Sequence, residues 1–476
     1  MMKMNSTGNF VSLLVALILT VCHTFARAQE ELTTADKLYG LSQFWKEVSY
    51  NFVYFDQVEG IDWDEIYKAY LTEVLESDNA FEYYRVMKKF AALLKDGGTR
   101  VDFPRWLSER YIAFPGIQLI EVDHKAYVVA VVEELGGRIP LKSQLLAIDG
   151  EPIQAVLERE VFPYISSSTE AWKWYEGVRG DMARGYGLLA GPRDSRATLT
   201  FELPDGTLLE EEVTRDITGL SGSDWVSLID LPDDTIEFQW LDDGVAYLTF
   251  NSFTDPDMIN QFRAMLDELG NARALIIDLR HNAGGNTLIV EDLLGFMTYR
   301  DLLGAKSRTR INNSVYRAFG GFSDLFEFAK EYEPYATGEV FGEIESDVLV
   351  SDETNMEEKI IMPTAVLIGI ETSGAAEDFL IYASQLPHFI FVGEPSNGNS
   401  GQSLYFGMPL GGEASVRAKR DTFPDGSDYI GLGIQPHVPV NWDPLSDKDE
   451  TLLKAQEIIL NEDINSIKEK RTAMLP

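Results

Sequence analysis

Three short, predominantly apolar runs constrain the fold of this chain most. They are "ALIIDLR" (274–280), "TAVLIGI" (364–370) and "HFIFVGE" (388–394). Runs of this length that end at glycine or a polar turn are typical of strands buried inside a sheet. Segments with helical periodicity alternate with strand-like runs. "DPDMINQFRAMLDEL" (255–269) lies between "GVAYLTF" (244–250) and the first run, and the stretch from Ala375 lies between the second and the third. The alternation predicts an α/β core over residues 235–445.

The rest of the 476-residue chain divides by its periodicity. Residues 29–105 carry apolar side chains at spacings of three and four, which predicts a helical region. Residues 106–220 read as a small β-rich domain with a helical insertion, because strand-like runs flank Asp-Gly turns in "LLAIDGEPI" (145–153) and in the hairpin that follows. Residues 446–476 predict a charged C-terminal helix.

The first 28 residues resemble a signal peptide. Lys3 precedes an apolar run from Phe10 to Val21, and small residues end the segment at Ala28. We therefore expect export to the periplasm or the cell surface, with no transmembrane span in the mature chain. Cys22 is the single cysteine, and a lipid anchor there is the alternative, although Val21 stands where such a signal needs a small residue.

The composition excludes several kinds of partner. The net charge is -37, from 40 basic and 77 acidic residues, and argues against nucleic acid and anionic membranes. Without a second cysteine or an HExxH spacing, the sequence predicts no disulfide, no metal site and no cofactor.

The segment "DLRHNAGG" (278–285) ends the first buried strand. Gly284 and Gly285 would let backbone N–H groups face a ligand, as in an oxyanion hole. A plain strand-to-helix turn is the alternative.

The segment "ETSGAAEDFL" (371–380) lies where serine enzymes place a nucleophile, between a strand and a helix. Ser373 and Gly374 compete for the turn. Ser373 could be a nucleophile, but the favoured interpretation is that it caps the helix. Of the mature chain's four histidines (His124, His281, His388 and His437), His281 alone is close to the candidate site in sequence, and the favoured interpretation is that it is a solvent-facing loop residue. "LKDGGTRVDFP" (94–104) predicts only a loop.

Seven motifs in order resemble the tail-specific, or C-terminal-processing, serine peptidases, most closely the branch related to tricorn core peptidases. They are "YGLSQFWKEVSYNF", "DGGTRVDFP", "LLAIDGEPI", "ALIIDLRHNAGG", "TSGAAEDFL", "VGEPSNGNSGQ" and "PDGSDYIGLGIQPHVPV". The resemblance implies a crotonase-like (ClpP-like) α/β catalytic core, a PDZ-like β-rich domain and an N-terminal helical region. It also implies that the partners are C-terminal tails of peptides or proteins.

The chain departs from the family at the reacting positions. The family's serine position is Gly374, and its histidine position, within Asp-Gly-His-Thr, is Gly98. The position of the lysine used by another branch is Asn399, and His437 replaces a usual aspartate. The oxyanion turn of Gly284 and Gly285 is kept, with the N–H of Ala375 as its expected partner. Since glycine can neither attack a carbonyl nor move a proton, hydrolysis should be impaired.

Three interpretations stay open. The first is an exported serine peptidase of this family with impaired catalysis. The second is a non-catalytic pseudopeptidase that binds peptides. The third is an active peptidase that uses Ser373 as a substitute nucleophile, with Glu377, Asp378 or His281 as its base.

Overall fold

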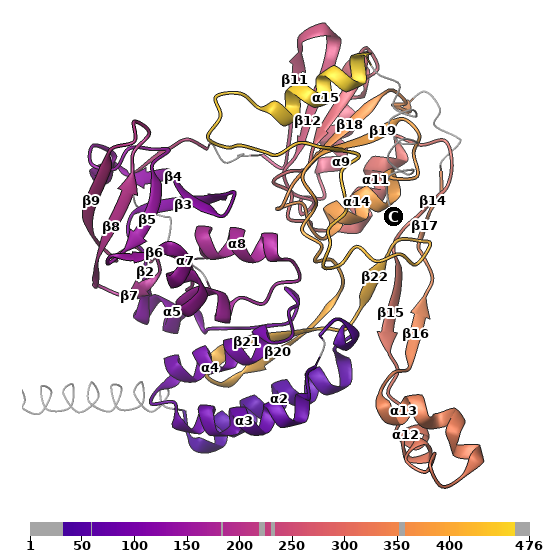
Figure 1. Cartoon of the computed structure of the whole chain (residues 1–476). Helices are drawn as coiled ribbons and strands as arrows, with labels where there is room; N and C mark the ends of the chain where they lie inside the picture. The colour runs from indigo at the N-terminus through magenta and orange to yellow at the C-terminus, as the bar shows by residue number, and fades with distance from the viewer. Residues whose placement is uncertain are drawn as a thin grey trace, which may run out of the picture.

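The computed structural model describes residues 32–58, 60–181, 184–218, 224–229, 234–351 and 358–461. Within them the chain has a mixed α/β fold with six sheets. Figure 1 shows N-terminal helices at the bottom, a β-rich part at one side and a helix-covered sheet at the top. The expected signal peptide, Cys22 and residues 462–476 lie outside the described ranges. No helix within those ranges is long and apolar enough to cross a bilayer.

The N-terminal part consists of three main helices: α2 (Thr34–Asn51), α3 (Trp63–Glu76) and α4 (Ala80–Ala92). A capping box between Thr33 and Asp36 begins α2. Aromatic side chains fill the space between the helices, and the rings of Trp63 and Phe90 stack with centroids 4.4 Å apart. The apolar residues spaced three and four apart in the sequence therefore form the interface between these helices.

These helices pack on a sheet built from distant parts of the chain. Its strands are β1 (Arg100–Asp102), β21 (Gly412–Arg417) and β20 (Ser403–Met408), in that order. Arg100 pairs with Ser415 across more than 300 residues of sequence. The N-terminal helices and the α/β core consequently share one hydrophobic core.

The β-rich part contains a seven-stranded sheet. Its strands are β3 (Ile117–Val122), β4 (Lys125–Val132), β5 (Gln144–Ile148), β6 (Glu151–Pro152), β8 (Arg196–Glu202), β9 (Leu208–Thr214) and β10 (Trp225–Ser227). Asp149 and Gly150 both have positive φ, as a tight hairpin turn between β5 and β6 requires. Helix α8 (Glu170–Arg179) packs beside β3 and faces the core.

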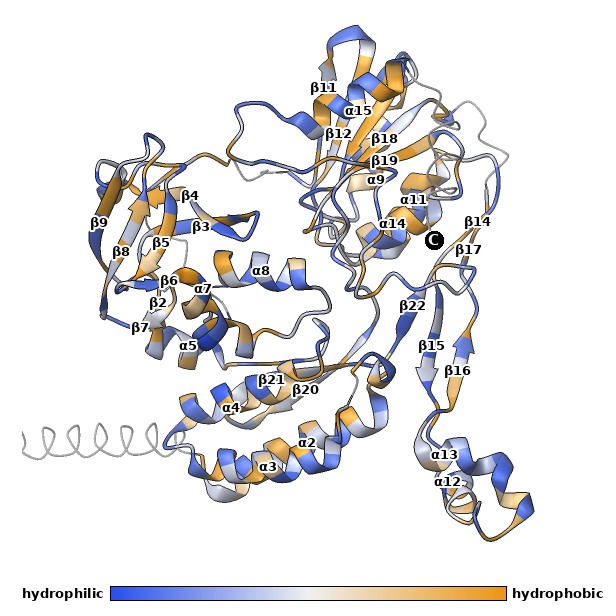
Figure 2. Ribbon diagram, in the orientation of Figure 1, coloured by the Kyte–Doolittle hydropathy of each residue, from blue (hydrophilic) through white to orange (hydrophobic). Residues whose placement is uncertain are grey.

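The core is a six-stranded sheet. Its order is β11 (Ile236–Leu241), β12 (Val245–Phe250), β13 (Ala274–Asp278), β18 (Thr364–Ile368), β19 (Phe389–Gly393) and β23 (Val438–Pro439). Only β11 runs antiparallel to its neighbour. The central strands are buried and apolar, as Figure 2 shows for β18. The three predicted runs are thus the three central parallel strands, with carboxyl ends at one edge.

Helices cover both faces of this sheet. Side chains on one face, such as Leu275 and Val366, share a core with α9 (Met258–Ala264), α11 (Thr287–Gly295) and α14 (Ala375–Ala383). The alternate side chains, such as Ile276 and Leu367, pack with α15 (Glu450–Asn461). The two-residue alternation of a strand therefore assigns each helix to its face.

A long arm projects from the core (Figure 1). Strands β15 (Lys306–Arg310) and β16 (Phe341–Ile344) form its stem, and α12 (Ser314–Gly320) and α13 (Glu333–Thr337) its tip. No periodicity in the sequence indicated this arm.

Candidate active site

Gly374 forms the sharp turn between β18 and α14. Its φ of 58° and ψ of -126° are unfavourable for residues with a side chain. A Cβ on Gly374 would meet only ordinary contacts, with Ala283 O and Gly284 Cα at 3.5 Å. The backbone thus keeps the strained turn on which serine enzymes present a nucleophile, and leaves room for a side chain there.

Ser373 does not cap α14. The N-cap residue is Gly374, which makes no side-chain capping bond, so the interpretation of Ser373 as the cap is wrong. The Ser373 N–H donates to Asn282 O at 3.0 Å, while its hydroxyl has no hydrogen-bond partner among the described residues. Gly374 takes the N-cap position because glycine adopts these backbone angles at a lower energetic cost than serine.

The glycine turn after β13 lies against the sharp turn at Gly374, which we call the elbow. Gly285 needs to be glycine, since a Cβ would lie 2.4 Å from Phe253 carbonyl atoms. The N–H of Gly284 donates to Asn282 Oδ1 at 2.8 Å and is therefore engaged. The N–H groups of Gly285 and Ala375 have no acceptor within the described part of the chain. These two donors are available to a developing oxyanion.

The space beside Gly98 is filled. A Cβ on Gly98 would lie 2.1 Å from Cζ of Arg417, whose side chain is 4% exposed. The Arg417 Nε lies 3.5 Å from Asp96 Oδ1. The same guanidinium donates to Asn399 O at 3.1 Å and to Asn399 Oδ1 at 2.5 Å. One cation thus fills the space beside Gly98, where the sequence resemblance predicts one family base, and binds Asn399, at the predicted position of the other.

The two carboxyls considered as bases for Ser373, those of Glu377 and Asp378, are hydrogen-bonded to other groups. Glu377 is fully buried and accepts hydrogen bonds from Ser396 Oγ, Gly398 N–H and Ser400 Oγ at 2.5–2.7 Å. Burial nevertheless raises its pKa. Asp378 accepts from Thr287 Oγ1 at 2.6 Å, and burial raises its pKa to about 6. These contacts make both residues supports of the loops around the elbow.

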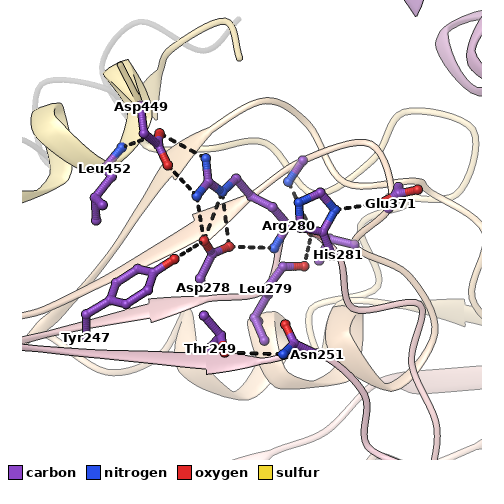
Figure 3. Close-up of polar contacts among 12 residues, drawn as sticks. Tyr247, Thr249, Asn251, Asp278, Leu279, Arg280, His281, Glu371, Asp449 and Leu452 are labelled. Carbon is purple, nitrogen blue, oxygen red and sulfur yellow. Dashed lines mark hydrogen bonds and ion pairs between the residues drawn. The ribbon is translucent and has the colours of Figure 1, made fainter. Parts of the chain in front are cut away.

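His281 has a carboxylate partner. Its Nδ1 lies 2.7 Å from Glu371 Oε2 (Figure 3). Glu371 also accepts from Tyr175 OH at 2.5 Å and from Arg179 at 2.7 Å, both on α8. Burial alone would raise the pKa of Glu371, but these hydrogen bonds and the charge of Arg179 outweigh burial and lower it. Glu371 therefore stays ionised and orients the imidazole.

A cavity of about 600 Å³ opens between the N-terminal helices, α8 and the core. Its walls include Gly97, Asp102, Glu176, His281, Glu371, Ser373 and Asn399. The structure thus brings Ser373, His281 and Asn399 to one space, next to the Gly98 position. His124, His388 and His437 do not line it, and the described residues hold no group of three or more potential metal ligands.

Sequence reasoning missed Arg417 and the partnership of His281 with Glu371. Glu371 carried a usable signal, because it and His281 both follow buried parallel strands, whose carboxyl ends meet at one edge. Arg417 carried none, since it reaches the site from a strand in another sheet.

Comparisons with known proteins agree with this architecture. Residues 244–440 match the family model of peptidase family S41. Mature CPAF complexed with lactacystin is similar, with 16% identity and a TM-score of 0.64 over 93% of this chain and 98% of that one. Mature CPAF has the same identity and TM-score, over 92% of this chain and 95% of that one. The photosystem II D1 C-terminal processing protease is 16% identical over 91% and 99%, with a TM-score of 0.47. At such identities the likeness to CPAF shows a shared fold.

Proposed function

We propose that this chain, which belongs to peptidase family S41 through its residues 244–440, is an exported protein that binds the C-terminal tails of peptides or proteins. In this proposal, hydrolysis by the family's own arrangement is lost. The core acts as a crotonase-like scaffold, the β-rich part as a PDZ-like module, and the protein works in the periplasm or at the cell surface.

The observation that carries the proposal is the guanidinium of Arg417 beside Gly98. A missing side chain alone could leave a hole for water or a substituting base. Here a buried, ion-paired cation fills the space instead. A permanently charged guanidinium cannot accept a proton, so proton transfer from this position is excluded. With Gly374 lacking a nucleophile, the cavity retains binding surface without the family's reacting groups.

The β-rich part offers an edge for an extended tail. Within the described strands β3 pairs only with β4, so its second edge has no strand beside it. Helix α8 packs against the same strand and also lines the cavity. An extended peptide can add to such an edge through backbone hydrogen bonds. This placement would lead a tail from β3 toward the elbow.

Calorimetry on the mature chain, from Gln29 onward, tests the proposal. Peptides with a free terminal carboxylate should bind more tightly than amidated copies, since tail recognition needs the carboxylate. Bound peptide should slow amide exchange in β3 and in residues 371–374. The Ser373→Ala variant is measured in parallel, so that cleavage at that residue cannot mask binding. Equal affinity for both peptide forms, or binding without protection of β3, would contradict tail recognition.

A further inference from the structure

We propose that Ser373, His281 and Glu371 form a displaced acyl-transfer centre, one residue before the family's nucleophile position. Ser373 is the nucleophile, His281 the general base and Glu371 the positioning residue. The centre would take acyl compounds with an activated carbonyl, such as esters. This inference goes beyond tail binding and does not depend on it.

The first support is the setting of His281. The Glu371 carboxylate at Nδ1 leaves Nε2 as the nitrogen able to accept a proton. The imidazole is 35% exposed and lines the cavity, so Nε2 is not sealed inside the core. Its ring also packs edge-on to Trp442, with centroids 5.6 Å apart. A base held on two sides is oriented before a substrate arrives.

Glu371 is itself held in place. Tyr175 and Arg179 donate to one of its oxygens, and the other faces His281. Those two donors come from α8, so the carboxylate joins the β-rich part to the core. This leaves Glu371 one orientation, which is what a positioning residue requires.

The second support is the place of Ser373. The bond from its N–H to Asn282 O ties it to the residue directly after His281. Its hydroxyl caps no helix and, among the described residues, has no hydrogen-bond partner, yet Ser373 lines the same cavity as His281 and Glu371. A serine hydroxyl that has no hydrogen-bond partner among the described residues and lines one cavity with an oriented imidazole is placed where a substrate could bring the two groups together as nucleophile and base.

The reaction balances without a cofactor. Ser373 Oγ forms a bond to the acyl carbon and gives its proton to His281 Nε2, while the carbonyl electron pair moves to oxygen. The N–H groups of Gly285 and Ala375 are the donors for that oxyanion. The tetrahedral species then expels the leaving alcohol, which takes the proton from His281. Water repeats the sequence on the acyl-serine and releases the acid.

The decisive experiment is labelling of the mature chain with a fluorophosphonate, with mass mapping of the adduct. We expect one adduct on Ser373, abolished in Ser373→Ala and kept in Ser166→Ala, which alters another serine of the same cavity. His281→Ala should slow labelling by about 10²–10⁴-fold, the usual contribution of a general base. No adduct on folded protein, or an adduct that persists in Ser373→Ala, would overturn the proposal.

The rate of labelling in two Glu371 variants tests its positioning role. The groups facing His281 among the described residues are Glu371 and, through it, Tyr175 and Arg179, with Trp442 on the other side. Glu371→Gln should slow labelling of Ser373 in the folded protein, because a neutral amide no longer holds the imidazole through a charge-assisted hydrogen bond. Glu371→Asp keeps the charge and should restore part of the rate. An unchanged rate in both variants would assign Glu371 a purely structural role. Tail binding by Ser373→Ala is a separate readout, so the two proposals can fail separately.

Discussion

Gly98 and Arg417 depend on each other at the scale of single residues. Gly98→Ala would place a methyl group inside the volume of a buried guanidinium. Arg417 would have to leave Asp96, which is 2% exposed, and a broken buried ion pair costs about 3–5 kcal/mol. We therefore expect a loss of about 3 kcal/mol in the free energy of unfolding, measured with denaturant. Gly407→Ala, in open space on β20, is the control and should change little. Equal effects of the two substitutions would mean that Arg417 moves freely.

The same contact predicts the result of placing a serine at position 374 and a histidine at position 98. Gly374→Ser with Gly98→His should remain inactive, because the imidazole has no space while Arg417 stays. Adding Arg417→Ala should permit hydrolysis of an activated ester. All variants carry Ser373→Ala, so that only the elbow position is assayed. A double variant that hydrolyses ester without the third change would show that Arg417 is no barrier.

At the scale of elements, a buried ion cluster joins α15 to the core sheet (Figure 3). Arg280, next to His281, bonds Asp278 on β13 and both carboxylate oxygens of Asp449. Asp449 Oδ1 also accepts the N–H of Leu452 at 2.9 Å in the first turn of α15. The cluster therefore fixes the helix and the strand end that carries the candidate base.

Asp449→Ala should destabilise the protein by about 2–4 kcal/mol, since it removes a helix cap and one partner of a buried cation. Asp447→Ala is the matched control, because this neighbouring residue is 93% exposed and pairs with Lys142 at the surface. It should leave the free energy of unfolding nearly unchanged, because exposed ion pairs contribute little to stability. Chemical denaturation of both variants measures the difference. Similar losses would mean that the cluster adds nothing beyond surface charge.

Elements made from local patterns could be predicted from the sequence. The runs at 274–280 and 364–370 became parallel neighbours, and the Asp149–Gly150 turn formed its hairpin. Pairings between distant segments could not be predicted. The bond between β1 and β21 and the reach of α8 to Glu371 depend on the three-dimensional arrangement. For the same reason the glycine at position 98 was visible, but the arginine that fills its space was not.

At the scale of the whole molecule, buried carboxyls of two kinds set the response to pH. Burial raises the pKa of one group: Glu121, Glu176, Glu377, Asp378 and Glu394. Charged partners outweigh burial and lower the pKa in another: Asp102, Asp278 and Glu371. Carboxyls with a raised pKa therefore lower the free energy of unfolding as the pH rises. Carboxyls with a lowered pKa lower it as the pH falls.

Asp378 gives a measurable case. Its folded pKa of about 6 lies above the ordinary 3.8, so the folded state holds the proton more tightly. The stabilisation of the folded state by the protonated Asp378 carboxyl is therefore complete below about pH 4 and is lost as the pH rises through about 6. Relative to Asp378→Asn, the parent should therefore lose about 2 kcal/mol of unfolding free energy between pH 4.5 and 7. Asp324→Asn, on the exposed arm, should follow the parent. A constant gap between parent and Asp378→Asn would show that burial does not shift this carboxyl.

The arm departs most from a compact molecule, and its tip exposes large apolar side chains. Phe322, Leu325, Phe326 and Phe328 are each between 47% and 73% exposed. Among the described residues, hydrogen bonds join the tip to Arg310 of the stem and to Tyr50 of the N-terminal part. A tip with so few ties should add little to the stability of the body, while its exposed patch should attract apolar ligands.

Replacing residues 312–339 by Asn-Gly tests this separation. The Ile311 N–H already donates to Val340 O, so a two-residue turn can close the stem. We expect the melting temperature to change by only a few degrees and the binding of a hydrophobic fluorescent dye to fall sharply. The intact arm with Phe322→Ser, Leu325→Ser and Phe328→Ser is the matched control and should lose dye binding too. A collapse of the fold in the shortened chain, with the triple variant unaffected, would mean that the arm is part of the cooperative core. Dye binding retained in both variants would place the apolar surface elsewhere, most directly in the cavity beside Ser373.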